Sequence, residues 1–455
     1  MKPQESRRNF LKQTGILAAA GTVLAGGMVP KVHAAENNTI KVALIGCGGR
    51  GMGAAREALS ADPNVKLWSV ADAFQDKSQG SVRALKEHFT KQEKGHVIDV
   101  APERTFDGMA SYKDALDALS PGDVALLTSP PAFRPLHYAY AVEKGLNVFA
   151  EKPVAVDIPG LRSLQESNKK AKEKGLKIAV GLNNRHYLRT EETVKAIQDG
   201  KLGELFAFFV YRCHTPHRIG DRGNRTPLQQ QLRRIFNFNW TTGGFIVDAL
   251  IHNLDICCWA NQKLPVAALG MGGRLFRRDE DDLIDNASVQ YTFDDGKKMH
   301  MFTVTMDNTW TGFRSIVHGS KGSAILGEGV GDPKFYEDWN GKKPFWTPQS
   351  PGNNSYQTEH DRFFKAIRDN QEWNELDRGI DATFVPIMGR MAIETGKEVK
   401  AEEAWKSTFQ YAPNVAELTL DGDSPVMPDE NGNYPIPVPG KATINNPYNV
   451  SADSE

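Results

Sequence analysis

The chain has 455 residues, of which 40% are hydrophobic and 24% charged, which is enough for two hydrophobic cores of ordinary domain size. The formal net charge is −1, and loss of the first 34 residues, with five basic side chains against one acidic, would leave it near −5. This balance argues against a protein that binds nucleic acid or an anionic membrane surface.

The first 34 residues have the features of an export signal. The segment Ser6–Lys12 contains the pair Arg7-Arg8, and a Gly- and Ala-rich apolar stretch follows over residues 15–29. That stretch is shorter than the ~20 apolar residues that span a bilayer, and the small residue Ala34 suits cleavage. We expect recognition by the twin-arginine export machinery, cleavage after Ala34, no stable membrane anchor, and a periplasmic or otherwise exported location.

A glycine-rich turn follows the first expected strand. Residues 39–45 are β-branched and apolar, as in a buried strand, and residues 52–59 show a helical pattern. A G-x-G-x-x-G turn between a strand and a helix lets the backbone approach a pyrophosphate at the helix N-terminus. The sequence therefore predicts a dinucleotide site formed by Gly46, Gly48, Gly49, Arg50 and Gly51.

The second expected strand, residues 65–71, ends on Asp72. This carboxylate lies 21 residues beyond Gly51, where the dinucleotide fold places its acceptor for the ribose hydroxyls. An acidic residue there repels a 2′-phosphate, so NAD is favoured over NADP. Lys77 lies close enough along the chain to keep NADP as the alternative.

Strands and helices alternate through the rest of the first half. Strands are expected at residues 123–128, 147–150 and 177–181, with helices at 134–144 and 159–174. Such alternation with short connections predicts a parallel doubly wound sheet, whose ligands bind at the carboxyl ends of the strands. Further cofactor contacts are accordingly expected from Ser129, Pro130, His137, Glu151 and Lys152.

Two motifs resemble a known family. The segment 128–153, which ends in Glu151-Lys152-Pro153, and the pattern Gly243-Gly-x-x-x-Asp248-x-x-x-His252 are similar to the glucose–fructose oxidoreductase/inositol dehydrogenase/MocA (Gfo/Idh/MocA) family. The resemblance implies a Rossmann domain over residues 35–182 and an α/β domain with an open, mostly antiparallel sheet over 183–400. Family members oxidise or reduce a carbon of a sugar or cyclitol, some cleave glycosides through transient NAD oxidation, and a few bind nucleotide without catalysis.

Three residues of these motifs are the candidate catalytic groups. Oxidation of an alcohol by NAD needs a group that removes the hydroxyl proton and donors that hold the developing alkoxide. Lys152, at a strand end, is suited to either task. Asp248 and His252 are four residues apart and would share one face of a helix, and His252 titrates nearest to neutral pH. The alternatives are a solvated surface lysine and a helix-capping pair.

Other polar and aromatic residues are candidates for contacts with the substrate. Arg185 and Tyr187 follow the last Rossmann strand, although a polar helix N-terminus would explain them as well. His214 and Arg218 follow a strand expected over residues 205–212. Trp240 would stack on a sugar ring or belong to the core.

No metal site is expected. His214 and His217 have the spacing of a metal pair, but no third ligand is suitably placed. The four cysteines, Cys47, Cys213, Cys257 and Cys258, show no metal or disulfide spacing and are most simply buried thiols.

The last part of the chain offers fewer signals. Residues 287–293 and 299–305 alternate in period two around a turn, which predicts a hairpin in a sheet with one solvated or partner-covered face. We expect a homo-oligomer. Residues 401–455, rich in Pro, Gly and Asn after Pro413, are expected to form an extended arm or a disordered tail.

The leading functional hypothesis is an exported NAD-dependent oxidoreductase acting on a hydroxyl carbon of a sugar or glycoside. The main alternative is a redox-neutral glycosidase, in which NAD oxidises a ring carbon, acidifies the neighbouring C–H bond and permits elimination. A non-catalytic nucleotide-binding protein is the third possibility. Export favours a retained cofactor that is regenerated on the enzyme, because free NAD is scarce outside the cytoplasm.

Overall fold

Six parallel strands form the first sheet of the computed structural model, which describes residues 38–216, 223–276, 280–326 and 332–448. The strand order, β3-β2-β1-β4-β5-β6, is that of a doubly wound dinucleotide-binding sheet. The predicted fold class is therefore confirmed. The strands are β1 Ile40–Ile45, β2 Val65–Asp72, β3 Thr105–Asp107, β4 Val124–Leu127, β5 Asn147–Ala150 and β6 Ile178–Val180.

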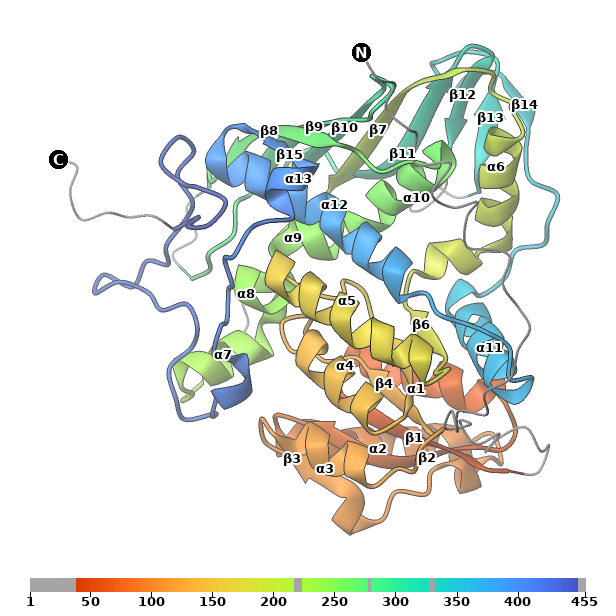
Figure 1. Cartoon of the computed structure of the whole chain (residues 1–455), viewed down its shortest axis with the longest axis vertical. Coiled ribbons are helices and arrows are strands. Elements are labelled where there is room, and N and C mark those ends of the chain that lie inside the picture. Colours follow the sequence, from red (N-terminus) through yellow and green to blue (C-terminus); the bar gives the residue numbers. More distant parts are fainter. Residues whose placement is uncertain (1–37, 217–222, 277–279, 327–331, 449–455) are drawn as a thin grey trace, which may run out of the picture. The chain divides into compact units, whose positions relative to one another are not determined.

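Helices connect these strands and cover the sheet (Figure 1). Every residue of β4 and β5 is buried, which explains why these strands appear in the sequence as continuous apolar runs rather than alternating ones. The helices are α1 Gly49–Ala61, α2 Gln75–Thr90, α3 Ser111–Asp117, α4 Arg134–Glu143 and α5 Ile158–Glu173, with short 3₁₀ turns at Gly95–Val97 and Pro102–Arg104.

The second sheet has nine strands in the order β14-β13-β12-β11-β7-β10-β9-β8-β15. All neighbours are antiparallel except β7 and β10, which confirms an open, mostly antiparallel sheet. The expected hairpin is the pair β9–β10. The strands are β7 Leu205–Cys213, β8 Ala267–Gly273, β9 Asn286–Thr292, β10 Lys298–Val304, β11 Gly312–Gly319, β12 Gly322–Ile325, β13 Lys334–Tyr336, β14 Pro344–Trp346 and β15 Glu398–Lys400.

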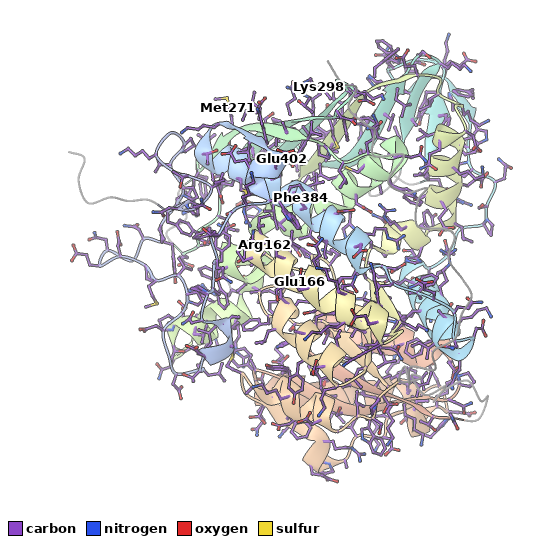
Figure 2. The ribbon with its side chains drawn as sticks, viewed as in Figure 1. Arg162, Glu166, Met271, Lys298, Phe384 and Glu402 are labelled. Carbon is purple, nitrogen blue, oxygen red and sulfur yellow. The ribbon has the colours of Figure 1, made fainter. Side chains whose placement is uncertain are left out.

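One face of the second sheet is covered by helices and the other is open. Helix α12 is buried nearly all round and packs against both β8 and α5. Figure 2 labels Phe384 on this helix. The helices are α6 Leu188–Gln198, α7 Pro227–Arg233, α8 Asn239–Thr242, α9 Gly244–Asp248, α10 Ile251–Asn261, α11 Ser355–Arg368, α12 Leu376–Thr395 and α13 Ala401–Ala404, with 3₁₀ turns at Asn183–His186, Ile235–Asn237 and Val415–Glu417.

The open side of the second sheet, here called the outer face, carries apolar side chains. Met271 is 74% exposed and Phe302 46% exposed, and Leu269 lies beside Met271 on the same side of β8. Figure 2 shows Met271 and Lys298 on the side of the sheet away from α12. The outer face is thus the solvated or partner-covered face that the strand periodicity predicts.

Residues 401–448, here called the C-terminal arm, contain little regular structure but are packed against the second half of the chain. Tyr411, Leu418 and Val426 are buried in a separate core cluster together with Phe238 and Trp240. Of the two sequence interpretations, this geometry corresponds to an extended arm. The expected export signal lies outside the described residues, and no helix within them is long and apolar enough to cross a membrane.

Candidate functional site

The turn after β1 can be formed only by glycines at two positions. Gly46 has a φ of +96°, and a Cβ there would lie 2.5 Å from the amide nitrogen of Ser129. A Cβ on Gly51 would lie 2.0 Å from the carbonyl oxygen of Gly46. By contrast, a Cβ on Gly48 or Gly49 would meet nothing within 4 Å, so space remains above the turn.

This open space lies at the N-terminus of a long helix. Gly48 is the N-cap of α1 and supplies no side chain to the helix, so the first amide N–H groups remain available to an anion. A close-packed turn with open space in front of these amides fits a pyrophosphate. The glycine turn therefore has the shape that a dinucleotide requires.

Asp72 lies at the carboxyl end of β2, beside the glycine turn. Its Oδ2 accepts a hydrogen bond from the amide of Cys47 at 2.8 Å, and its Oδ1 accepts one from the amide of Phe74 at 2.9 Å. Burial raises the pKa of Asp72, and these two hydrogen bonds act in the opposite direction. Each carboxylate oxygen keeps a free lone pair, so the group can also accept hydrogen bonds from ribose hydroxyls.

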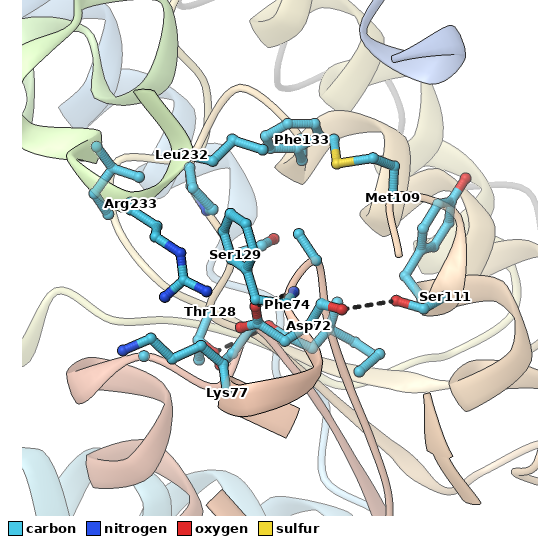
Figure 3. A pocket seen from close by; sticks show the side chains of 18 of the residues that line it. Asp72, Phe74, Lys77, Met109, Ser111, Thr128, Ser129, Phe133, Leu232 and Arg233 are labelled. Atoms are coloured by element: carbon cyan, nitrogen blue, oxygen red, sulfur yellow. Dashed lines mark hydrogen bonds between the residues drawn. The ribbon is translucent and has the colours of Figure 1, made fainter. Parts of the chain in front are cut away.

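A cavity of about 620 Å³, here called the dinucleotide cavity, joins these features. Its floor comes from the Rossmann domain and includes Gly46, Gly48, Asp72 and Ser129 (Figure 3). Its roof comes from residues 225–237 of the second half of the chain. The volume lies in the range of ordinary small-molecule and cofactor sites.

Ser129 and His137 form one wall of the dinucleotide cavity, next to Pro130. The Ser129 hydroxyl lies 2.9 Å from Nδ1 of His137, and the imidazole stacks against Tyr112 with ring centres 4.2 Å apart. Burial, together with the nearby Arg134 guanidinium, lowers the pKa of His137 to about 3. The imidazole is therefore neutral at physiological pH and holds the serine in place.

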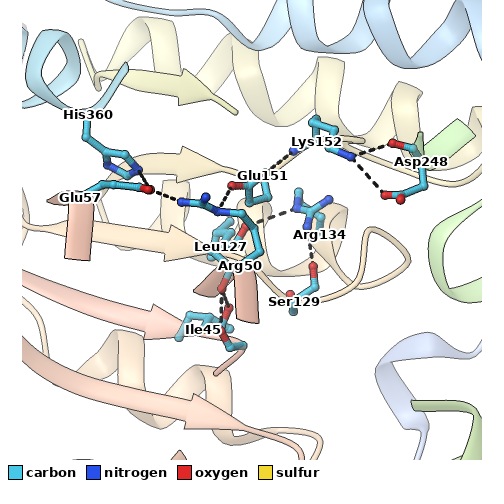
Figure 4. Close-up of polar contacts among 12 residues, drawn as sticks. Ile45, Arg50, Glu57, Leu127, Ser129, Arg134, Glu151, Lys152, Asp248 and His360 are labelled. Atoms are coloured by element: carbon cyan, nitrogen blue, oxygen red, sulfur yellow. Dashed lines mark hydrogen bonds and ion pairs between the residues drawn. The ribbon is translucent and has the colours of Figure 1, made fainter. Parts of the chain in front are cut away.

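Lys152 and Asp248 are brought together at the carboxyl end of β5. The Lys152 ammonium donates to the backbone carbonyl of Asp248 at 2.7 Å and lies 3.3 Å from its carboxylate Oδ1 (Figure 4). Both side chains remain partly exposed, at 18% and 20%. The pair thus combines a primary amine and a carboxylate that solvent and ligands can still reach.

The helix expected to carry Asp248 and His252 on one face is interrupted. Helix α9 ends at Asp248 and α10 begins at Ile251. At the break, the carbonyl of Asp248 accepts from Lys152, and the carbonyl of Ala249 accepts from Arg212 at 2.6 Å. Side chains bind both carbonyls, so the expectation of a single continuous helix is wrong. The Asp248 carboxylate contacts Lys152.

His252 is buried at the start of α10. Its Nδ1 has no hydrogen-bond partner within the described part of the chain. Burial, followed by the positive charges of Lys152 and Arg212, holds the pKa of His252 well below its ordinary value. A neutral imidazole with an unpaired nitrogen can exchange a hydrogen bond with a ligand hydroxyl, but it is a weak proton acceptor at neutral pH.

Two buried arginines hold the backbone around Lys152 and Asp248. The Arg134 guanidinium donates to the carbonyls of three strand-end residues, Leu127, Ser129 and Pro153. Arg390 of α12 donates to the carbonyl of Gly243 at 3.0 Å and to that of Val156 at 2.8 Å. These contacts connect the loop that carries Lys152 with the loop that leads to Asp248.

Two residues predicted to contact the cofactor are instead paired with each other. Arg50 Nε lies 2.9 Å from Glu151 Oε1, and the same guanidinium contacts Glu57 and the ring of Tyr356 (Figure 4). Neither Arg50 nor Glu151 lines the dinucleotide cavity. Glu151 directly follows β5, so this ion pair connects the end of that strand to α1, the helix that begins at the glycine turn.

Arg185 and Tyr187 do not line the dinucleotide cavity. Arg185 forms a bidentate ion pair with Asp255, at 2.7 and 2.8 Å, and lines a different cavity between α10 and α12. The Tyr187 hydroxyl donates to Asp332 at 3.0 Å. Both residues therefore have protein partners away from the dinucleotide cavity, and their contact with a sugar stays a prediction.

Trp240 is fully buried. Its indole nitrogen donates to Oε1 of Gln231 at 2.5 Å, and its ring contacts Phe133. No face of the indole is available to a sugar ring, which favours the alternative assignment to the core. Arg218 and His217 lie outside the described residues.

A small second cavity links His214 to Asp248. The lining residues include both of these side chains together with Phe236 and Asn237, and the last two also line the dinucleotide cavity. Asn237 is 4% exposed, and its Nδ2 has no hydrogen-bond partner within the described residues. A buried unpaired amide is costly, so Asn237 is a further candidate for ligand contact.

No pattern in the sequence pointed to Asn237 or to the roof of the dinucleotide cavity. Residues 223–239 have the composition of a polar loop, and nothing in their spacing relates them to Asp72. Within the described ranges, no group of three or more His, Cys, Asp or Glu side chains could hold a metal ion, and all four cysteines are buried and free.

Comparison with known protein families gives two matches. Residues 40–182 match the oxidoreductase family with an NAD-binding Rossmann fold, and residues 191–325 match the GFO/IDH/MocA C-terminal domain. Together the two matches account for more than half of the chain. The first contains the glycine turn, Asp72 and Lys152, and the second contains Asp248 and His252.

Two curated relatives are inositol 2-dehydrogenases. The protein from Rhizobium meliloti (strain 1021) is 25% identical over 289 residues, which are 63% of this chain and 74% of the relative. The protein from Klebsiella pneumoniae (strain 342) is 29% identical over 154 residues, which are 32% of this chain and 38% of the relative.

Solved structures share the fold at low sequence identity. The myo-inositol 2-dehydrogenase from Lactobacillus plantarum has a TM-score of 0.57 at 19% identity, covering 80% of this chain and 99% of that one. GenD2 from gentamicin A biosynthesis, solved in complex with NAD, has a TM-score of 0.59 at 21% identity, covering 80% and 96%. The aldose–aldose oxidoreductase from Caulobacter crescentus, complexed with glycerol, has a TM-score of 0.58 at 16% identity, covering 80% and 100%.

Proposed function

Because the chain belongs to the Gfo/Idh/MocA family of NAD-binding oxidoreductases, we propose that it is an NAD-dependent dehydrogenase acting on a hydroxyl carbon of a sugar, glycoside or cyclitol. The observation that carries this proposal is the pairing of Lys152 with Asp248 at the end of β5. This pair lies next to β4, whose carboxyl end lines the dinucleotide cavity. The inositol 2-dehydrogenases among the relatives support a polyhydroxylated substrate.

The chemistry requires one hydride acceptor and one proton acceptor. A bound nicotinamide supplies the hydride acceptor. We assign the transfer of the hydroxyl proton to the Lys152 amine, as the carbon loses its hydride. Asp248 orients the Lys152 amine, and neutral His252 holds the reacting oxygen by a hydrogen bond. Burial, the largest cause of the lowered pKa of His252, favours this division of roles over proton abstraction by the imidazole.

NAD is the cofactor we propose in preference to NADP. Asp72 presents a carboxylate to the dinucleotide cavity where a ribose would lie, and a negative charge there disfavours a 2′-phosphate. Lys77 lines the same cavity and offsets part of that charge. The same protein preparation should therefore reduce NAD at a higher rate than NADP.

A substrate panel tests the function. Purified protein would be incubated with sugars, cyclitols and aryl glycosides, and each reaction assayed for reduced nicotinamide, for ketone products and for released aglycone. Ketone formation coupled to reduction of NAD supports the dehydrogenase. Released aglycone without net reduction would indicate the redox-neutral glycosidase, and bound dinucleotide without either product would indicate a non-catalytic protein.

We further propose that the protein is exported by the twin-arginine machinery with its dinucleotide already bound. The pair Arg7-Arg8, followed by an apolar stretch and Ala34, supports this location. The apolar outer face of the second sheet supports association into a homo-oligomer, because exposed apolar patches commonly mark interaction sites.

A further inference from the structure

The roof of the dinucleotide cavity comes from a segment that no dinucleotide motif includes. Residues 225–237, here called the roof segment, contain α7 and the 3₁₀ turn after it. They lie across the cavity from Asp72, more than 150 positions earlier in the chain. The site is thus enclosed by two parts of the chain that are remote in sequence.

Arg233 fastens the roof segment to the floor. Its guanidinium forms two hydrogen bonds with the carboxylate of Asp76, at 2.6 and 3.2 Å. The same group lies 4.0 Å from the ring centre of Phe74 (Figure 3). Asp76 is in the first turn of α2 and follows Asp72 by four residues, so the contact is made at the edge of the expected ribose site.

The contact with Arg233 also affects the pKa of Asp76. The hydrogen bond from Arg233 is the largest influence on this carboxylate and lowers its pKa. The guanidinium is 26% exposed, and the carboxylate is 60% exposed. The pair therefore lies at the rim of the cavity and can open without disrupting a buried core.

The roof segment is held from behind by the C-terminal arm. The Thr226 hydroxyl donates to the carbonyl of Leu420 at 2.7 Å, and Gln231 donates to the carbonyl of Val426 at 2.8 Å. Trp240 is hydrogen-bonded to Gln231 on the same side. One side of the roof segment is thus held by the C-terminal arm, and Arg233 connects the segment to α2.

We propose that Arg233, with Asp76 and Phe74, forms a clasp that retains the bound dinucleotide by closing the ribose edge of the cavity. This inference rests on the proposed function, since it requires a dinucleotide in the cavity. Asp72 binds the ribose from one side of the cavity, and the clasp blocks release of the dinucleotide on the other side. An enzyme that works where free dinucleotide is scarce gains from slow release, which a rim contact controls without touching the reacting atoms.

Dinucleotide release from the purified holoprotein tests the clasp. Protein loaded with reduced dinucleotide would be mixed with a large excess of NAD, and the release rate followed by loss of bound-state fluorescence. Arg233→Gln should accelerate release by roughly five- to thirtyfold, the effect of one ion pair together with one cation–π contact. Asp76→Asn removes only the ion pair and should accelerate release by a smaller factor, about two- to fivefold. The double variant should release no faster than Arg233→Gln, and Arg233→Lys should fall between Arg233→Gln and the wild type.

A matched control uses another bidentate ion pair. Arg368 pairs with Asp62 at 2.8 and 2.9 Å, between α11 and the end of α1, and does not line the dinucleotide cavity. Arg368→Gln should leave the release rate unchanged. Equal release rates for the wild type and for folded Arg233→Gln, or equal acceleration by Arg368→Gln, would overturn the clasp. Absence of dinucleotide binding by the wild type would contradict the proposed function, and the clasp with it.

Discussion

Lys152 and Asp248 are 96 positions apart in the chain, and their contact depends on residues that need not touch a ligand. Arg134 holds the carbonyl of Pro153, next to Lys152, and Arg390 holds the carbonyl of Gly243, at the start of the loop that leads to Asp248. A buried guanidinium satisfied by carbonyl groups fixes backbone positions strongly, because each lost partner would leave a buried polar group unpaired. The position of the Lys152 amine relative to Asp248 thus depends on the two buried arginines, Arg134 and Arg390.

Replacement of Lys152 by Ala should remove activity while the fold persists. If its amine takes the substrate proton, turnover should fall by roughly 10²–10⁴, the usual contribution of a positioned acid or base. Bound dinucleotide and melting temperature should stay close to those of the wild type. Steady-state turnover, dinucleotide content after denaturation and thermal melting would be measured on the same preparation.

The control for this change is Lys170→Ala. Lys170 lies on α5 with its side chain 66% exposed, and it should tolerate substitution. A Lys152→Ala variant that melts at a lower temperature but retains full activity per folded molecule would assign Lys152 to structure. Such a result would remove the proton-transfer role.

The lowered pKa of His137 predicts how the free energy of unfolding depends on pH. Its pKa is lowered to about 3 in the folded protein, whereas an unfolded histidine titrates near ~6.5. Between these values the unfolded chain binds a proton that the folded protein does not, so stability falls as pH decreases from about 6.5 towards 3. His137→Gln should flatten this dependence by at most about 1.4 kcal/mol per pH unit.

Urea unfolding at several pH values between neutrality and mild acid would measure the effect. The other buried histidines remain in the variant, so a reduced slope is expected rather than a flat profile. The comparison uses the slope and not the absolute stability, which the substitution also changes. Parallel profiles for the wild type and the variant would contradict the assignment of a neutral His137.

At the scale of elements, side-chain contacts override local preference in two places. The pattern Gly-Gly-x-x-x-Asp-x-x-x-His favours one helix, yet Lys152 and Arg212 engage carbonyls at the junction of α9 and α10. The C-terminal arm has the composition of a tail, but its few apolar residues fit a core cluster around Trp240. In both places, contacts distant in sequence decide the local structure.

The packing of the arm predicts a specific stability effect. Leu418 is 6% exposed in the cluster with Phe238 and Trp240, so Leu418→Ala should cost about 2–4 kcal/mol in the free energy of unfolding. Val438, 49% exposed on the same arm, offers a control, since Val438→Ala should change stability little. Chemical denaturation of both variants would measure the difference, and equal small effects would indicate that the arm detaches in solution.

At the scale of the whole chain, the proposed export rests on the pair Arg7-Arg8 within the first 34 residues. Replacement of Arg7 and Arg8 together by Lys should leave the protein in the cytoplasm with residues 1–34 attached, because the twin-arginine pair is read by a receptor. Cell fractionation with mass determination of the N-terminus would measure this. Normal export of the double variant would contradict the twin-arginine interpretation and remove the argument for loading the cofactor before export.

The outer face of the second sheet predicts association. Phe302→Glu or Met271→Glu places a charge on an exposed apolar surface, which should leave the fold intact and shift the protein towards monomer if this face is the interface. Sedimentation velocity over a range of concentrations would measure the shift. Leu275→Glu, at a residue 77% exposed outside the sheet, is the control. An unchanged oligomer in the Phe302 and Met271 variants would place the interface elsewhere.

The first sheet, the glycine turn and the position of Asp72 could all be predicted from the amino-acid sequence. These features depend on short-range patterns: apolar runs form buried strands, helices follow within a few residues, and a tight turn at Gly46 and Gly51 leaves no room for a side chain. Lys152 was located for the same reason, since it directly follows a buried strand. The family motifs also led to a correct expectation for the second sheet.

The partner of each polar group, by contrast, became known only from the three-dimensional fold. This fold paired Arg50 with Glu151 and Arg185 with Asp255, and it buried Trp240. It also placed the roof segment and Asn237 at the cavity, and the C-terminal arm behind the roof segment. These outcomes depend on contacts between residues far apart in the chain, where burial and hydrogen bonding outweigh local preference, and no spacing in the sequence records such contacts.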